Sequence, residues 1–281
     1  MKFDRIIASV LAAGAAASST SVSAQTRGGF EIGLELFDYS YRERLNGQTI
    51  VHDDGRFIGL AIDYTQRLGD NWFLRGRLSG AAGSVDYRSS GGIGFDSPAR
   101  LDDVTQGIGR FELQIGRDLM LSNTTSLTPF VGFATRVLND RSGGEETRDG
   151  LRGYDREVVY SYVPVGLALR HPLGERSALT VSAQYNRVVG GEAESRFSNL
   201  DPDLPDVKVN LNGGNGFELS AIADIPVGRR AVRVGPFMRR WSIAQSDTFV
   251  LTNPDDPTES IAFFEPQNRT TELGLKLSFA F

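Results

Sequence analysis

The stretch Glu272-Leu273-Gly274-Leu275-Lys276-Leu277-Ser278-Phe279-Ala280-Phe281 decides the fold. Leucine or phenylalanine occupies every second position, and charged or small residues lie between them. Successive side chains of a β-strand point to opposite faces, so this alternation predicts a strand with one apolar and one polar face. We therefore expect a half-buried strand that ends at Phe281.

The same period of two recurs along the whole chain from Gly28. Phe30 to Leu36 and Ile58 to Tyr64 are clear examples, with charged residues or glycine between the apolar ones. Ten strands are predicted in all, at 29–42, 56–68, 72–88, 105–118, 126–139, 156–171, 177–191, 215–226, 230–246 and 267–281. Several exceed the five or six residues usual in a soluble sheet, and they reach the roughly 9–11 residues of a tilted membrane strand.

The predicted connections alternate between short and long. Short ones lie near 68–71, 119–125, 173–176 and 227–229, and long polar ones near 43–55, 89–104, 140–155, 192–214 and 247–266. Short turns on one side and long loops on the other are typical of outer-membrane barrels. The sequence therefore predicts an all-β, antiparallel transmembrane β-barrel of ten strands, with eight or twelve as alternatives. A soluble β-sandwich is the competing fold.

The first 24 residues have the layout of a secretory signal peptide. Lys2 and Arg5 precede an apolar run from Ile6 to Ala17, and Val22-Ser23-Ala24 offers a cleavage site before Gln25. We expect residues 1–24 to be removed and residues 25–281 to form a single barrel domain in the bacterial outer membrane. No later stretch is apolar enough for a membrane-spanning helix.

Composition excludes several classes of function. The net charge of −5 gives no basic surface for nucleic acid. The absence of cysteine excludes disulfides and thiolate metal sites. We expect no cofactor and no metal, and we favour a monomer.

Charged residues alternate with the apolar ones and would be costly on the lipid face, at about 2–4 kcal/mol for each Arg or Lys near the midplane. We therefore place them inside the barrel, where acids and bases can pair. Because a narrow barrel is filled by its own side chains, we expect this network to plug the lumen. An anion-conducting pore lined by the basic residues is the alternative. The predicted lumen residues are Glu31, Glu35, Asp63, Arg75, Arg77, Arg110, Glu112, Arg136, Glu218, Arg239, Glu272 and Lys276.

Two surface features are also expected. Aromatic residues near the strand ends suggest girdles at the membrane interfaces, formed by Trp72, Phe73, Tyr87, Tyr162, Tyr185 and Trp241. If Arg239 points inward, its neighbour Arg240 points outward near the outer rim, beside Trp241. We predict that Arg240 and Trp241 contact lipopolysaccharide, because an outward arginine at that height can reach phosphates.

Several strand openings resemble those of the OmpA-like and porin-like superfamily of bacterial outer-membrane β-barrels. The segments are Leu127–Gly132, Tyr162–Leu167 and Val234–Phe237, together with the ending Glu265–Phe281. The resemblance covers essentially all of the chain after residue 24 and names no single function. It implies that the alternating residues Leu273, Leu275, Leu277, Phe279 and Phe281 act as the signal read by the barrel assembly machinery, which would be a partner during biogenesis.

Catalytic patterns are weak. His52 lies beside Asp53 and Asp54, and His171 precedes a proline in a predicted turn. An omptin-like protease would need an Asp-x-His set beside a pair such as Asp102-Asp103, and a lipid A hydrolase would need a paired serine and histidine. Asp201, Asp203 and Asp206 lack the spacing of a calcium loop. We therefore predict a non-enzymatic barrel that acts through its outer loops, with a narrow pore and an outer-membrane enzyme as alternatives.

Overall fold

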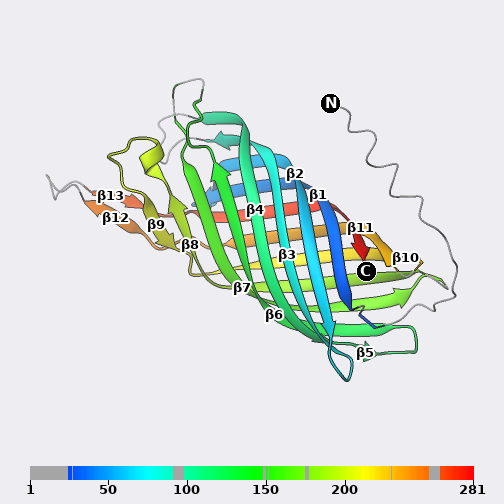
Figure 1. The fold of residues 1–281 in the computed structure, drawn as a ribbon. Helices are drawn as coiled ribbons and strands as arrows, with labels where there is room; N and C mark the ends of the chain where they lie inside the picture. The colour runs from blue at the N-terminus through cyan, green and yellow to red at the C-terminus, as the bar shows by residue number, and fades with distance from the viewer. Residues whose placement is uncertain are drawn as a thin grey trace, which may run out of the picture.

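The computed structural model describes residues 25–26, 28–90, 98–147, 150, 152–174, 177–228, 230–252 and 260–281. Ten antiparallel strands close into a barrel, as predicted (Figure 1). In spatial order they run β10-β11-β14-β1-β2-β3-β4-β6-β7-β8, and β8 pairs with β10 to close the ring. They are β1 (Gly29–Leu45), β2 (Gln48–Arg67), β3 (Trp72–Ser89), β4 (Ala99–Arg117), β6 (Ser126–Arg141), β7 (Asp155–Pro172), β8 (Ala178–Ser195), β10 (Gly214–Val227), β11 (Arg230–Ile243) and β14 (Gln267–Ala280).

The remaining elements lie at the two ends of the barrel. At the short-turn end, β5 (Leu119–Met120) pairs with β6. At the long-loop end, β9 (Val207–Asn210) follows the single turn η1 (Phe197–Asn199) and pairs antiparallel with the last residues of β8. Later in the sequence, β12 (Phe249–Thr252) pairs with β13 (Ser260–Phe263). None of the described residues belongs to a helix long and apolar enough to cross a membrane.

One of the expected long loops is wrong. Residues 43–55 belong to strands, because β1 and β2 continue to a two-residue turn at Asn46-Gly47, whose φ angles are 49° and 83°. Asn-Gly is the preferred pair for such a hairpin turn, which needs positive φ at both residues. Alternation of apolar and polar residues did not predict these strand ends, because their outward positions, such as Arg42 and Asp54, are polar. Four long outer connections remain.

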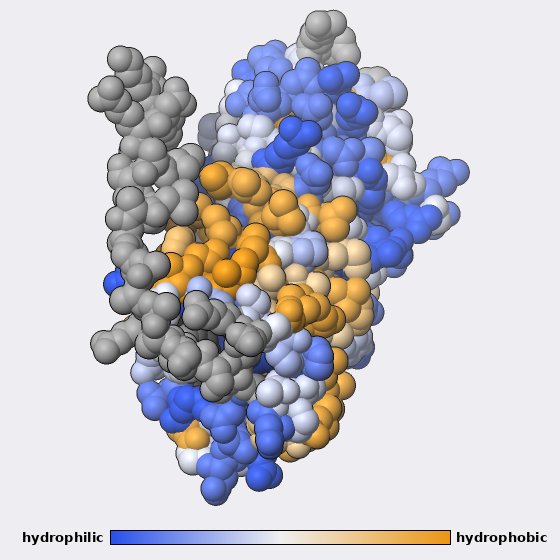
Figure 2. Space-filling model, turned by 90° about the vertical axis from the view of Figure 1, so that its right-hand side faces the viewer, coloured by the Kyte–Doolittle hydropathy of each residue, from blue (hydrophilic) through white to orange (hydrophobic). Residues whose placement is uncertain are grey.

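The polarity of the two faces inverts along the strands. On β1 the outward side chains of Ile32, Leu34 and Leu36 are 46%, 46% and 58% exposed, whereas the next outward residue is Asp38. The inward face changes the other way, from Glu35 to Phe37. Figure 2 shows the outcome as an apolar belt between two hydrophilic ends. The belt is the surface that faces the lipid hydrocarbon, and the strands continue beyond it as a polar collar, formed by the outer parts of β1–β4, β6–β8, β10, β11 and β14.

Inward glycines make room for large aromatic side chains. In four cross-strand pairs, an aromatic ring lies over the glycine directly opposite, so that an added Cβ would come within 2.3–2.7 Å of a ring atom. The pairs are Phe57–Gly83, Phe73–Gly116, Phe130–Gly166 and Trp241–Gly216. These rings cover the inner wall at the glycines, so aromatic side chains as well as charged ones occupy the lumen.

Candidate functional site

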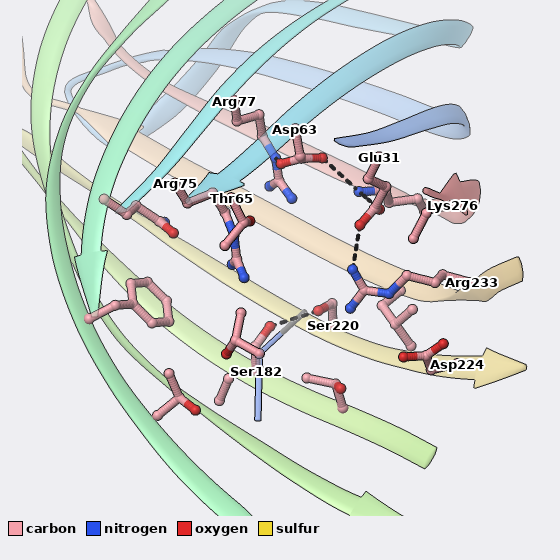
Figure 3. Close-up of a pocket in the computed structure, with 18 of the residues that line it drawn as sticks. Glu31, Asp63, Thr65, Arg75, Arg77, Ser182, Ser220, Asp224, Arg233 and Lys276 are labelled. Carbon is pink, nitrogen blue, oxygen red and sulfur yellow. Dashed lines mark hydrogen bonds and ion pairs between the residues drawn. The ribbon is translucent and has the colours of Figure 1, made fainter. Parts of the chain in front are cut away.

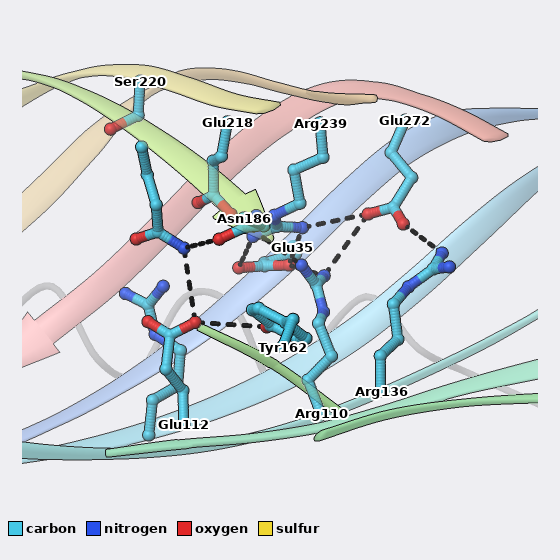
Figure 4. A network of polar contacts seen from close by, with 12 residues as sticks. Glu35, Arg110, Glu112, Arg136, Tyr162, Asn186, Glu218, Ser220, Arg239 and Glu272 are labelled. Atoms are coloured by element: carbon cyan, nitrogen blue, oxygen red, sulfur yellow. Dashed lines mark hydrogen bonds and ion pairs between the residues drawn. The ribbon is translucent and has the colours of Figure 1, made fainter. Parts of the chain in front are cut away.

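The centre of the lumen is organised around Glu272 on β14, whose side chain is fully buried (Figure 4). Its carboxylate accepts hydrogen bonds from Arg136 Nη2 at 2.7 Å, from Arg239 Nη1 at 3.2 Å and from Arg110 Nη2 at 3.3 Å. Arg110 and Arg136 come from β4 and β6, while Glu272 lies on the facing wall. These ion pairs therefore cross the lumen.

Arg239 on β11 links further acids into the same network. Its guanidinium binds Glu35 through two hydrogen bonds of 2.8 and 2.9 Å and donates from Nε to Glu218 at 3.0 Å. The three arginines are thus balanced by three glutamates. This balance is required because a buried charge without a partner is costly, by about 3–5 kcal/mol when one member of a pair is removed.

Glu112 on β4 lies beside this network but has polar, uncharged partners. Tyr162 Oη donates to it at 3.2 Å and Gln184 Nε2 at 3.4 Å, and Gln114 Nε2 is also in contact. Gln184 in turn donates to Asn186 at 2.8 Å. The amides and the tyrosine therefore extend the central network toward β7 and β8.

Aromatic side chains pack inside the lumen on the outer side of the charges. Trp241 is 1% exposed, and its ring packs against Tyr160 and Tyr162 with centroids 5.3 and 4.9 Å apart. The Arg136 guanidinium lies over the Trp241 ring at 5.3 Å. Because Trp241 points inward, the prediction that it contacts lipopolysaccharide is wrong.

The predicted aromatic girdle needs the same correction. Phe73, Tyr87, Tyr162 and Trp241 belong to the inward face, and only Trp72 and Tyr185 are exposed outward, by 39% and 45%. Trp241 lies two residues from the inward Arg239, so the strand period places both on one face. That parity was readable in the sequence.

The short-turn end of the lumen opens into a vestibule, a cavity of about 150 Å³ (Figure 3). Lys276 Nζ pairs with Glu31 at 2.8 Å and with Asp63 at 3.3 Å, and Arg77 Nε pairs with Asp63 at 2.6 Å. Arg75 differs, because it donates to Thr65 Oγ1 at 3.2 Å and forms no ion pair with a described acid. The twelve predicted lumen residues thus divide into a central network and this vestibule.

A second polar cluster, at the outer rim, was not predicted. Arg156 Nη1 contacts Glu43 and lies 3.4 Å from Glu265, while Tyr41 Oη lies 3.2 Å from Glu265. Burial raises the pKa of Glu265 to about 7, although Arg156 opposes the shift. Glu43 falls within the region assigned to a loop, which is why the pattern of inward polar residues was missed there.

Asp53 and Asp140 form the other half of the rim cluster. Gln106 Nε2 bridges them, at 2.9 Å from Asp53 Oδ2 and 3.1 Å from Asp140 Oδ2. A polar layer therefore lies at the outer end of the lumen, above the aromatic one.

The candidate catalytic and metal residues are dispersed. Among the described residues, the only hydrogen-bond partner of His52 is its strand neighbour Asp54, and His171 Nδ1 lies 2.9 Å from Thr125 Oγ1 at the short-turn end. Asp201 and Asp206 accept backbone N–H groups of their own loop. Within the described ranges, no three His, Asp or Glu side chains form a group that could hold a metal ion.

The remaining predicted surface residues point outward. Leu273, Leu275, Leu277, Phe279 and Phe281 are 38–59% exposed on the apolar belt. Arg240 is also exposed, on the outer face of β11. The predicted signal peptide lies outside the described residues, so its cleavage stays a prediction.

Comparisons with known proteins agree on the architecture. A family model described as autotransporter β-domain matches residues 4–235. The outer membrane protease OmpT from Escherichia coli is similar with a TM-score of 0.57 and 14% identity, covering 90% of this chain and 97% of that one. The translocator domain of the autotransporter NalP from Neisseria meningitidis gives 0.47 and 14%, covering 90% and 89%. No curated protein matches in sequence. At these identities the structural likeness concerns the fold alone.

Proposed function

Because this chain belongs to the autotransporter β-domain family and is a barrel of the bacterial outer membrane, we propose that it is a sealed, non-enzymatic barrel that acts through its outer collar. Its role is structural or one of surface interaction. The partners that fit this role are outer-membrane lipid, lipopolysaccharide and, during biogenesis, the barrel assembly machinery.

The observation that supports a sealed lumen is the pairing across the barrel at Glu272. Arginines from β4 and β6 meet glutamates from β1, β10 and β14 at distances of 2.7–3.9 Å. An aromatic layer and the rim cluster lie outside this network. A solute would have to separate several buried ion pairs to pass, which is unfavourable in a site shielded from water.

Conductance in planar lipid bilayers tests this proposal. Purified protein should insert without stable channel openings, and a detergent extract of a known porin serves as the positive control. Large, long-lived, anion-selective steps would contradict the sealed lumen and would favour the alternative of a narrow pore. The vestibule and Arg75, which forms no ion pair with a described acid, are the observations that favour that alternative.

The proposal of no catalysis has its own test. His52 is on the outer wall of β2, and its contact with Asp54 is between adjacent outward positions of one strand. Lipid A from cells with and without the protein should give the same mass spectrum, and an outer-surface peptide substrate should be cut at the same rate. A changed acylation pattern or protein-dependent cleavage would establish an enzyme.

A further inference from the structure

Three arginines and three hydroxyl residues form a grid on the outer wall of the barrel, across the neighbouring strands β11, β14 and β1. The strand register places them in two rows of directly paired residues. The upper row is Ser242–Arg269–Arg42, and the lower row is Arg240–Thr271–Ser40.

The grid faces away from the lumen. Its inward neighbours Trp241, Thr270 and Tyr41 are 1%, 1% and 3% exposed, so the alternate residues on each strand point outward. Arg240 is exposed, while Arg42 and Arg269 are half-buried along the strand surface. The long aliphatic stems of these arginines can therefore lie along the wall while their guanidinium groups reach the surrounding headgroups.

Among the described residues, acids balance only one of the three positive charges of the grid. Arg42 and Arg269 are directly opposed, an arrangement that destabilises a pair of strands. Arg42 has one acidic partner, Asp54 at 3.1 Å, whereas Arg240 and Arg269 have no ion pair with any described acid. Arg269 Nε is buried and lacks a hydrogen-bond acceptor. An external anion that binds the accessible guanidinium nitrogens of the grid would supply the missing charge.

The position of the grid indicates which anion this is. Met238 and Leu273 form the last apolar pair directly below the lower row, and Leu273 and Leu275 are 58% and 59% exposed. On β1 the same row is occupied by Asp38, which pairs with Arg56 at 3.3 Å and marks the start of the polar collar. Two residues of a strand span about 7 Å, so the guanidinium groups lie just above the hydrocarbon boundary. An anion held here has an acyl region beneath it, as a phosphorylated lipid has.

We propose that Arg240, Arg269 and Arg42, with Thr271 and Ser242, bind a phosphate group of lipopolysaccharide in the outer leaflet. Guanidinium groups bind phosphate oxygens through paired charge-assisted hydrogen bonds, and hydroxyls can donate to the remaining oxygens. The apolar wall at Leu273 and Leu275 receives the acyl chains. The site is independent of whether the lumen is sealed.

The test compares lipid A binding by the wild type and by the double variant Arg240→Gln, Arg269→Gln. Folded protein in non-ionic detergent with EDTA is titrated with bisphosphorylated lipid A and with the same lipid A after its phosphates are removed, and binding is read by native mass spectrometry. The control variant Arg88→Gln, Arg100→Gln removes two outward arginines that already have acidic partners, at 3.9 and 2.7 Å. Heat-modifiable gel mobility establishes that every variant is folded.

We expect the double variant to bind bisphosphorylated lipid A about tenfold more weakly for each arginine lost, as for a charged hydrogen bond. The control should stay within about twofold of the wild type. Phosphate-free lipid A should bind the wild type and the double variant alike and weakly. Equal binding of bisphosphorylated lipid A by the wild type and the double variant would overturn the site, as would equal binding of the two lipids by the wild type.

Discussion

Replacing Glu272 with glutamine tests the central network at its most connected point. Glu272 has no exposed surface and accepts hydrogen bonds from three arginines within 3.3 Å. The substitution keeps the shape of the side chain but leaves three guanidinium groups facing only Glu35 and Glu218. Removing one partner of a buried pair costs about 3–5 kcal/mol, so we expect the free energy of unfolding to fall by that amount.

The measurement is urea unfolding of the barrel in lipid vesicles, followed by tryptophan fluorescence. Trp241 is a suitable reporter because the Arg136 guanidinium of the network lies over its ring. The matched control is Glu192→Gln, which removes an acid that pairs with Lys208 at 3.2 Å on the exposed rim, with side chains 49% and 56% exposed. Exposed pairs contribute about 0–1 kcal/mol, so this control should be nearly neutral.

A double variant makes the test sharper. If the cost of Glu272→Gln comes from an uncompensated charge, removing Arg136 as well, as Arg136→Met, should cost less than the sum of the two single changes. The reasoning would be refuted if the free energies of unfolding of Glu272→Gln and Glu192→Gln differed by less than about 1 kcal/mol. It would also be refuted if the effects of Glu272→Gln and Arg136→Met were strictly additive. Either result would mean that the ion pairs across the lumen contribute little to stability.

Three further outcomes follow from the packing and the rim cluster. Burial raises the pKa of Glu265 from 4.5 to about 7, so the folded state holds a proton that the unfolded state releases, and stability is lost as pH rises from about 4.5 to 7. In the Glu265→Gln variant this pH-dependent loss in the free energy of unfolding should disappear, and the loss that disappears is at most about 3 kcal/mol at pH 8. An unchanged dependence of the unfolding free energy on pH would contradict the raised pKa of Glu265. Gly216→Ala places a methyl group 2.4 Å from the Trp241 ring and should cost about 1–3 kcal/mol, whereas Gly76→Ala, with its nearest neighbouring atom at 3.5 Å, should cost less than 1 kcal/mol; equal unfolding midpoints would argue against close packing. Trp241→Ala should cost about 3–5 kcal/mol in urea unfolding followed by heat-modifiable gel mobility, because the variant lacks the fluorescent reporter; a cost below about 1 kcal/mol would show that the aromatic layer is loosely packed.

The sequence alone predicted the ten barrel strands and the inward direction of the charged residues. Alternation of apolar and polar residues placed ten strands, and the cost of charge in lipid turned residues such as Glu35 and Arg239 inward. The ends of β1 and β2 were missed because the outward face becomes polar beyond Leu36, where the barrel leaves the hydrocarbon. Trp241 was misplaced because its residue type, rather than its parity with Arg239, was used to orient it.

The partners inside the lumen were not predictable in the same way. Glu272 and Arg136 are 136 residues apart and lie on walls that face each other. Which side chains meet across a barrel depends on its diameter and on the stagger between strands, and the alternation along one strand does not fix either quantity. The contact between Glu265 and Arg156 was not predictable either. It forms because the fold brings the start of β7 and the segment before β14 to the same level along the barrel axis.

The hairpin turn at Asn46-Gly47 is ten residues past Leu36, so about 30 Å of paired strand separates it from the last apolar outward residue of β1. A peptide inserted between Asn46 and Gly47 would be presented at a fixed height and orientation above the cell surface, because backbone hydrogen bonds hold the hairpin up to its tip. The barrel is therefore suited as a display scaffold, and antibodies against this region should recognise shapes shared by neighbouring strands that short linear peptides do not reproduce.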